Sequence, residues 1–215
     1  MHQQTPTAMH SEALRLNATG FLYRGIVKNV LDSTLALFAF IILSPLFILI
    51  AIRMKKDSPG PILVKQKCEG LKGHPFNIYK FRTHELVETG SFHGKKYVLS
   101  ETYVGKVLRE ANLENLPQLF NVFIGDMSLV GPRPNPINMT INNVDVKEIV
   151  PSYEVRSLVK PGMTGWARVN GFCGPTRTFK DATQRDRFDM DYLRKASFRF
   201  DWHIIFKTLP LIKLA

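Results

Sequence analysis

Basic side chains set beside turn-forming residues are the feature of this sequence best suited to chemistry. The chain has 215 residues and a formal charge of +11. Arg133 stands between two prolines, whose rings restrict the backbone, so its guanidinium is presented in a narrow range of positions. Lys65 and the cluster Lys80-Phe81-Arg82 lie in two short strand-like runs. These cations predict a negatively charged partner. The simpler alternative for Arg133 is an exposed arginine in an irregular loop.

Nucleic acid, anionic lipid and phosphorylated small molecules would all satisfy this charge. No zinc finger, helix-turn-helix pattern or aromatic RNA-binding signature accompanies it, so a membrane-tethered nucleic-acid binder would rest on charge alone. A long apolar segment favours the lipid and the small molecule. The two cysteines, Cys68 and Cys173, form no metal-ligand cluster, and we expect free thiols in a reducing cytosol.

The apolar segment that must place these cations runs from Leu35 to Ile52 and is interrupted only by Ser44. A helix of this length spans about 27 Å, against a hydrocarbon core of about 30 Å, so crossing is marginal. Pro45 lacks an N–H, which leaves the carbonyl of Ile41 without its helical donor. We therefore predict a kink at Ser44-Pro45, with the Ser44 hydroxyl satisfying part of the freed backbone.

The flanks of the apolar segment are basic on both sides. Lys28 precedes it, and Arg53, Lys55 and Lys56 follow it. A re-entrant hairpin that bends at Ser44-Pro45 would keep both ends on the cytoplasmic side, where Lys28 would reach lipid headgroups. An ordinary bitopic helix and a buried core helix remain the alternatives.

Breaker residues divide the chain into three parts. We expect a mobile polar tail over residues 1–22, a membrane-anchoring re-entrant helix over 23–57, and a compact cytoplasmic domain over 58–215. The expected fold class is α+β and mostly helical, with a small β-hairpin formed by Ile62 to Gln66 and Phe76 to Phe81.

The rest of the domain is expected to be loops and helices. A polar loop should run from Gly90 to about Ser100, and helices should cover Val104 to Glu110 and Leu116 to Phe123. A charged helix from Phe179 to Ala196 has Thr178 as its N-cap, and an apolar tail from Phe200 to Leu214 suits packing or a membrane surface.

Several motifs in one order resemble the bacterial sugar transferases, the monotopic phosphoglycosyl transferases. The resemblance covers the chain from about Lys28 to its end. Its motifs are Ser44-Pro45, Ser58-Pro59-Gly60-Pro61, Lys80-Phe81-Arg82-Thr83, Leu116-Pro117-Gln118-Leu119-Phe120-Asn121-Val122, Gly125-Asp126-Met127-Ser128-Leu129-Val130-Gly131-Pro132-Arg133-Pro134 and Lys160-Pro161-Gly162-Met163-Thr164-Gly165-Trp166.

The resemblance implies an enzyme on the cytoplasmic face of the bacterial inner membrane. It implies transfer of a sugar-1-phosphate from a UDP-sugar to undecaprenyl phosphate with release of UMP, the first membrane step of exopolysaccharide or O-antigen assembly. The stretch from Gly165 to Gly171 is similar to that of members that transfer glucose or galactose phosphate. The implied partners are both substrates, anionic lipids and downstream glycosyltransferases, without nucleic acid.

The same resemblance implies roles for individual residues. A site of Lys65, Arg82, Arg109 and Arg133 would hold the phosphates by charge-assisted hydrogen bonds, and Mg²⁺ would offset the remaining negative charge. A carboxylate nucleophile shortly after the Lys-Phe-Arg motif would form a covalent phospho-sugar intermediate, with a neighbouring glutamate on the metal.

The sequence departs from the family at that nucleophile. Aligned without a gap from Lys80, the expected Asp-Glu pair falls on Leu86-Val87, so Glu88 is the substitute nucleophile and metal ligand, with Glu85 beside it. The family's Asp-Glu-Leu-Pro-Gln reads Glu114-Asn115-Leu116-Pro117-Gln118, and an expected arginine is Cys68. Solvated surface charges are the alternative for both glutamates, and a catalytically inactive paralogue that regulates a true transferase is the alternative function.

Overall fold

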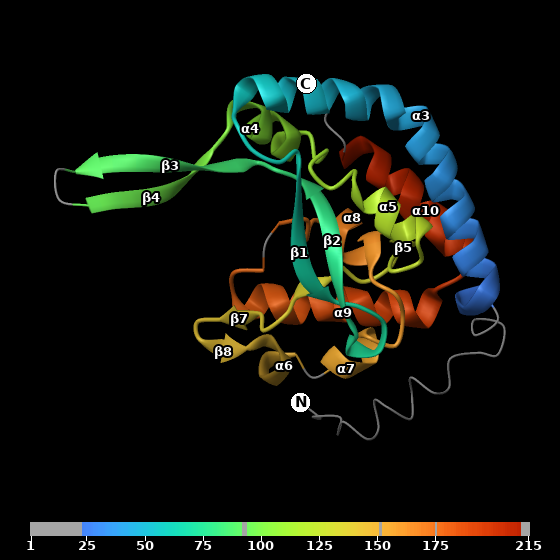
Figure 1. Cartoon of the computed structure of the whole chain (residues 1–215). Coiled ribbons are helices and arrows are strands. Elements are labelled where there is room, and N and C mark those ends of the chain that lie inside the picture. Colours follow the sequence, from blue (N-terminus) through green and yellow to red (C-terminus); the bar gives the residue numbers. More distant parts are fainter. Residues whose placement is uncertain (1–22, 92–93, 151, 175, 212–215) are drawn as a thin grey trace.

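A computed structural model describes residues 23–91, 94–150, 152–174 and 176–211 of the chain. It confirms a mostly helical α+β protein with one long apolar N-terminal helix and several small sheets (Figure 1). The tail expected over residues 1–22 lies outside the described residues.

The long helix α3 covers Lys28–Asp57 and follows a short π-helix, η1, at Tyr23–Val27. It bends around one side of the globular domain (Figure 1) and contains Pro45. The Ser44 hydroxyl donates to the carbonyl oxygen of Ile41 at 2.7 Å, so the predicted repair of the proline break is confirmed. α3 is long and apolar enough to cross a membrane by length and composition.

Both ends of α3 are bound to the same globular domain. At its start, the Lys28 ammonium pairs with Asp32 at 3.3 Å and with Asp201 of α10 (Phe198–Thr208). Lys28 is therefore buried and does not reach out to headgroups as expected. At its end, the Asp57 carboxylate accepts from the Val104 backbone N–H at 3.0 Å, at the start of α4 (Tyr103–Glu110).

The predicted hairpin is present, with longer strands than expected. Strands β1 (Leu63–Glu69) and β2 (Pro75–Phe81) pair antiparallel, and β6 (Asn135–Pro136) extends the sheet along β1. Side chains alternate across a strand, so the even-numbered residues of β1 and β2 share one face, where Cys68 and Ile78 are buried. The odd-numbered residues share the other face, where Lys65 is exposed and Phe81 is buried against Ile50 and Met54 of α3.

A second hairpin replaces the expected polar loop after Gly90. Strands β3 (His84–Ser91) and β4 (Gly94–Glu101) pair antiparallel and extend away from the domain (Figure 1). The mixture of polar residues and glycines hid this hairpin, because strand propensity depends more on pairing than on composition.

A short parallel sheet brings together two loops rich in glycine and proline, the breaker-rich loops at residues 125–134 and 160–171. β5 (Ser128–Val130) pairs with β9 (Gly162–Thr164), although their sequence positions are far apart. The backbones approach so closely that a Cβ on Gly131 would lie 2.6 Å from the Lys160 carbonyl oxygen. Glycine is required here because it has no Cβ.

Helices cover the remaining sides of this sheet. The predicted charged helix is confirmed as α9 (Phe179–Lys195), whose N-cap Thr178 forms a capping box with Asp181. Buried side chains of β5, α9 and α10 pack together, among them Val130, Tyr192 and Ile204. The remaining described elements are η2 (Leu71–Gly73), α5 (Gln118–Phe123), β7 (Thr140–Ile141), β8 (Val144–Asp145), α6 (Val146–Ile149), α7 (Tyr153–Arg156), α8 (Trp166–Val169) and η3 (Leu209–Leu211).

Candidate active site

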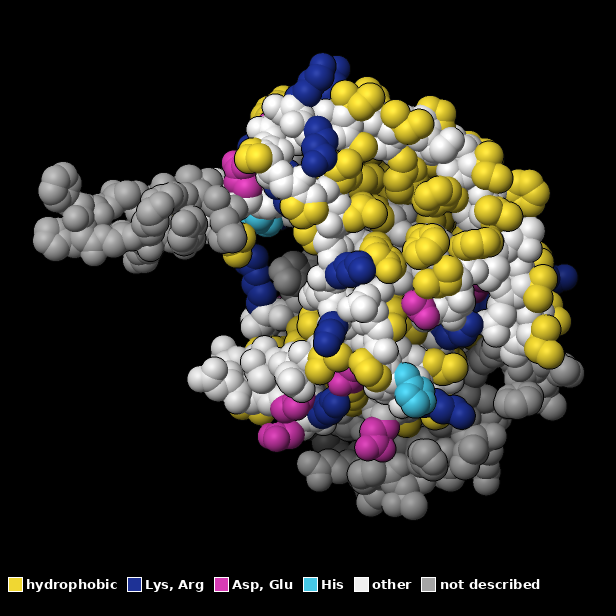
Figure 2. Space-filling model, viewed as in Figure 1, with side chains coloured by type: hydrophobic (Ala, Val, Ile, Leu, Met, Phe, Trp, Pro, Cys, Tyr) yellow, Lys and Arg dark blue, Asp and Glu magenta, His cyan; other side chains and the backbone are white. Residues whose placement is uncertain are grey.

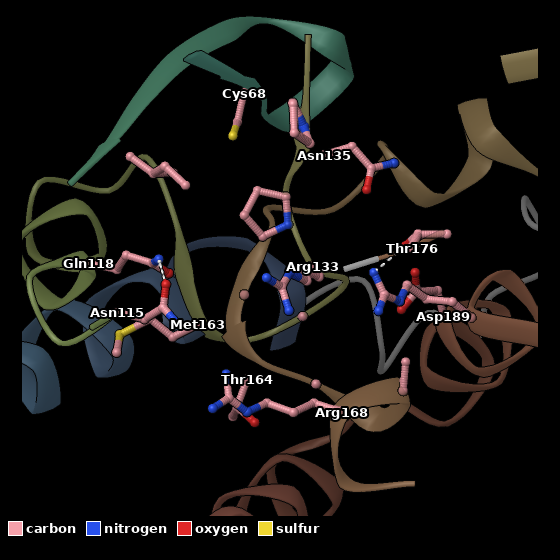
Figure 3. A pocket seen from close by; sticks show the side chains of 18 of the residues that line it. Cys68, Asn115, Gln118, Arg133, Asn135, Met163, Thr164, Arg168, Thr176 and Asp189 are labelled. Carbon is pink, nitrogen blue, oxygen red and sulfur yellow. Dashed lines mark hydrogen bonds between the residues drawn. The ribbon is translucent and has the colours of Figure 1, made fainter. Parts of the chain in front are cut away.

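A cavity of about 270 Å³ lies between the inner face of the β1–β2 hairpin and the two breaker-rich loops. Its wall includes Cys68 of β1, Arg133 after β5 and Arg168 of α8 (Figure 3). Lys80 of β2 and Arg185 of α9 line it as well. Four basic side chains from four separate parts of the chain therefore meet in one hollow, which is suited to an anion with several charges.

The fold explains why each cation points inward. Lys80 is an even-numbered residue of β2, and its ammonium donates to Gln66 Oε1 of β1 at 2.8 Å. Arg168 follows β9 directly in α8, and one of its guanidinium nitrogens donates to Asn112 Oδ1 at 3.1 Å. These contacts fix the orientation of the two cations in the cavity wall.

Arg133 is held through both its backbone and its side chain. Its carbonyl oxygen accepts from the Arg156 guanidinium at 2.7 Å, and its own guanidinium donates to the Cys173 carbonyl. Figure 3 shows Arg133 near the middle of the view, with Gln118 on one side and Thr176 and Asp189 on the other. The proline-flanked arginine thus lies in the cavity wall rather than in an open loop.

Burial lowers the pKa of all four cations from its ordinary value, and the pKa of Arg185 falls to about 10. Repulsion between neighbours adds to this, since Arg133 lowers the pKa of both Lys80 and Arg185. Bringing an anion into the cavity would relieve that repulsion.

The negative charge of Glu114 opposes this lowering. It acts to raise the pKa of three of the cations, namely Lys80, Arg133 and Arg168. It precedes Asn115, which lines the cavity and donates to Glu114 Oε1 at 3.4 Å. Arg109 Nε lies 3.9 Å from the other carboxylate oxygen. Glu114 is thus a half-buried carboxylate at the edge of a cationic cavity.

A second carboxylate, Asp189 of α9, lines the opposite side of the cavity. It is 1% exposed and lies 3.0 Å from an Arg156 guanidinium nitrogen. Burial raises the pKa of Asp189 to about 6, although the Arg156 charge opposes the shift. The same Arg156 binds the Arg133 carbonyl, so this ion pair supports the loop that carries Arg133.

The structure does not bring the four sequence-predicted cations together, because only Arg133 lines the cavity. Lys65 is exposed on the outer face of the hairpin, with its ammonium 5.6 Å from the centre of the Tyr79 ring. Arg82 is buried and donates to Ser58 and to the Pro59 carbonyl just after α3. Arg109 pairs with Glu101 at 3.2 Å, near His84.

The two sequence-predicted carboxylates both lie in the protruding hairpin. Glu85 is partly exposed in β3, and Glu88 pairs through its backbone position with Tyr97 of β4. Nothing is described of the Glu88 side chain. Leu86 and Val87 pair with Leu99 and Val98, so they are residues of a β-ladder. The catalytic role of Glu88 stays a prediction.

The sequence did not predict Arg168, Arg185 or Glu114 as site residues, and it gave Lys80 only as part of a basic cluster outside the expected phosphate site. Lys80 pairs with Val64, the neighbour of Lys65, so the two lysines lie on opposite faces of the hairpin, and a register assigned to the hairpin would have separated them. Arg168 stands in a breaker-rich loop like that of Arg133, which was also a usable signal. Arg185 had no such signal because it reaches the cavity only through the packing of α9.

The described lining of the cavity contains one carboxylate, Asp189, as a donor of the kind that the expected Mg²⁺ prefers. Among the described residues, no group of three His, Cys, Asp or Glu side chains could hold a metal ion. Asp189 is engaged by Arg156, and the neighbour of Glu114 is the neutral Asn115. Mg²⁺ is bound by oxygens, usually including one or two carboxylates that are free to coordinate it.

Comparison with known proteins assigns this arrangement to a family. The model of the family "Bacterial sugar transferase" matches residues 23–213. A UDP-glucose:undecaprenyl-phosphate glucose-1-phosphate transferase of Escherichia coli (strain K12) is 36% identical over 186 residues, which cover 86% of this chain and 39% of the relative.

Two further relatives are similar over a comparable share of this chain. A transferase of the same name from Caulobacter vibrioides is 40% identical over 188 residues, covering 85% of this chain and 68% of the relative. A UDP-N-acetylgalactosamine-undecaprenyl-phosphate N-acetylgalactosaminephosphotransferase of Aeromonas hydrophila is 35% identical over 191 residues, covering 86% and 43%. The chain thus spans about two fifths of the length of the Escherichia coli and Aeromonas relatives.

Proposed function

Because this chain belongs to the bacterial sugar transferase family, we propose that it transfers a sugar-1-phosphate from a UDP-sugar to undecaprenyl phosphate and releases UMP. The observation that carries the proposal is the cavity lined by four cations, three of which feel the charge of Glu114, the residue before the lining residue Asn115. Both substrates carry phosphates, which such a cavity would hold by charge-assisted hydrogen bonds. The product would be the first lipid-linked intermediate of exopolysaccharide or O-antigen assembly.

Glu114 is the nucleophile in this proposal. One of its oxygens attacks the phosphorus that carries the sugar, the bond from that phosphorus to the bridging oxygen breaks, and UMP leaves with the bonding electrons. The phosphate of undecaprenyl phosphate then attacks the same phosphorus, which releases the Glu114 carboxylate and gives the lipid diphosphate sugar. Lys80, Arg133 and Arg168 lie where they would stabilise the charge on the departing UMP.

The membrane placement that we propose is a re-entrant α3 on the cytoplasmic face of the inner membrane. Two observations support it: Lys28 and Asp57, at the two ends of α3, both contact the globular domain. A helix tied to one domain at both ends does not place those ends on opposite sides of a bilayer.

Apolar exposure indicates which surface meets lipid. Figure 2 shows hydrophobic side chains gathered over α3 and the surface it curves around. Ile42 is 73% exposed in α3, and Phe120 and Phe123 of α5 are also exposed. An apolar patch on this scale marks an interaction surface. Reporter tags placed at the two chain ends should both label from the cytoplasmic side, and opposite sides would contradict the hairpin.

The donor sugar is a hexose in this proposal, glucose or galactose before others. The names of the relatives point to glucose and to N-acetylgalactosamine, so both classes belong in a test. Detergent-solubilised protein with undecaprenyl phosphate should release UMP from at least one of UDP-glucose, UDP-galactose and UDP-N-acetylgalactosamine.

Matched variants assign the nucleophile in the same assay. Glu114→Gln should abolish UMP release, whereas Glu88→Gln should retain it; the reverse would return the role to Glu88. Absence of UMP release with every donor, under conditions where a relative is active, would contradict the proposed transferase activity. If that silent protein still bound UDP, the regulatory paralogue would account for it.

A further inference from the structure

The cavity carries an excess of positive charge that its own carboxylates do not offset. Four cations line it, namely Lys80, Arg133, Arg168 and Arg185. Among the described residues that line it, one has an acidic side chain, Asp189. Asp189 already pairs with Arg156, which lies outside that lining. A pyrophosphate that bridges a sugar and a nucleoside carries one negative charge on each phosphate, so these cations suffice to neutralise it.

The neighbourhood of Glu114 is arranged for hydrogen bonding rather than for a cation. Asn115 directs its amide N–H toward Glu114 Oε1, and its Oδ1 accepts from Gln118 Nε2 at 2.8 Å. Arg109 Nε lies 3.9 Å from the other Glu114 oxygen. An amide N–H donor and a guanidinium therefore lie beside the two carboxylate oxygens, and both disfavour the approach of a divalent cation.

Arg168 is one of two arginines in the described cavity lining with an unused buried donor, and the other is Arg185. Its Nε is buried and has no hydrogen-bond partner among the described residues, while another of its nitrogens donates to Asn112 Oδ1. A buried guanidinium with an unused donor costs free energy until a ligand satisfies it. Asn112 donates in turn to the Leu211 carbonyl at 3.1 Å, which ties this arrangement to the end of the α10–η3 segment.

We propose that Lys80, Arg133 and Arg168, rather than Mg²⁺, neutralise the donor's pyrophosphate and the departing UMP, so that donor binding and turnover do not require a divalent cation. This inference rests on the proposed function for its ligand. It concerns charge neutralisation only, and the guanidinium fork supplies the planar contacts that a metal would otherwise supply.

The test is a calorimetric titration of the full-length detergent-solubilised protein with UDP, in EDTA and in Mg²⁺. The expected dissociation constants agree within about twofold, because the cations that bind the diphosphate belong to the protein. Arg168→Gln should weaken UDP binding in EDTA about 10- to 150-fold, the loss of one charge-assisted hydrogen bond. Arg168→Lys, which retains the charge, should recover part of it, and unchanged melting temperatures would show that the variants fold.

UMP release by the wild type provides the second readout and should continue in EDTA. If EDTA abolished UDP binding or UMP release and Mg²⁺ restored it, the inference would be overturned. If the Glu88→Gln variant then lost this dependence on Mg²⁺, Glu88 would be the metal ligand. If no UMP appears in either condition, the proposed function fails, whereas the UDP titration still decides the question of the metal.

Discussion

Replacing Lys80 by methionine should weaken the binding of UDP strongly, because this side chain lies in the cavity wall. Its ammonium is half-buried and oriented by Gln66, so little reordering is needed to meet a phosphate. Methionine has a similar length and carries no charge. A hydrogen bond to a charged group contributes about 1.5–3 kcal/mol, and each 1.4 kcal/mol is tenfold, so the dissociation constant should rise about 10- to 150-fold.

Lys65→Met is the matched control for this prediction. Lys65 lies on the neighbouring strand but faces outward over Tyr79, and it should leave the UDP affinity within about twofold. Calorimetry or fluorescence competition measures both variants at one ionic strength, since salt screens exposed charges. A larger effect at Lys65 than at Lys80 would refute the placement of the phosphate site and favour the outer face of the hairpin.

Three other changes test the scaffold around the site. Gly131→Ala should destabilise the protein by about 1–3 kcal/mol, because the new Cβ would meet the backbone of Lys160 and Gly162. The melting temperature should fall by about 2–12 °C. Gly174→Ala is the control, because a Cβ there meets nothing within 4 Å. Thr178→Ala should cost about 1 kcal/mol through loss of the α9 cap and leave UDP affinity unchanged; an altered affinity would contradict a purely capping role. Burial raises the pKa of the Cys68 thiol to about 11, so its alkylation in the native protein should be slow at pH 8, and the alkylation rate should rise about tenfold per pH unit. Mass spectrometry follows this rate, and equal rates in native and unfolded protein would contradict the burial of Cys68.

Local signals in the sequence predicted the parts of the fold that depend on near neighbours. The Ser44 hydroxyl bonds the Ile41 carbonyl as expected, and Thr178 caps α9 as expected. The β1–β2 hairpin also follows from adjacent strand-like runs. Each of these features is decided within a few residues, where propensity and capping chemistry act.

Contacts between residues far apart in the chain determine the features that the sequence did not predict. Lys28 is buried because Asp201, 173 positions away, pairs with it. The parallel pairing of β5 with β9 brings Arg168 close to Arg133, and no local pattern states that pairing. The site therefore differs from the set of cations predicted along the chain, with Arg133 common to both.

The most direct test of the central claim is mass spectrometry of the protein after incubation with its UDP-sugar and without undecaprenyl phosphate. Glu114 is expected to carry the sugar phosphate as a covalent adduct, which should disappear in Glu114→Gln and on addition of undecaprenyl phosphate. An adduct on the peptide that contains Glu88, with none on the peptide that contains Glu114, would contradict the assignment of the cavity as the reaction site.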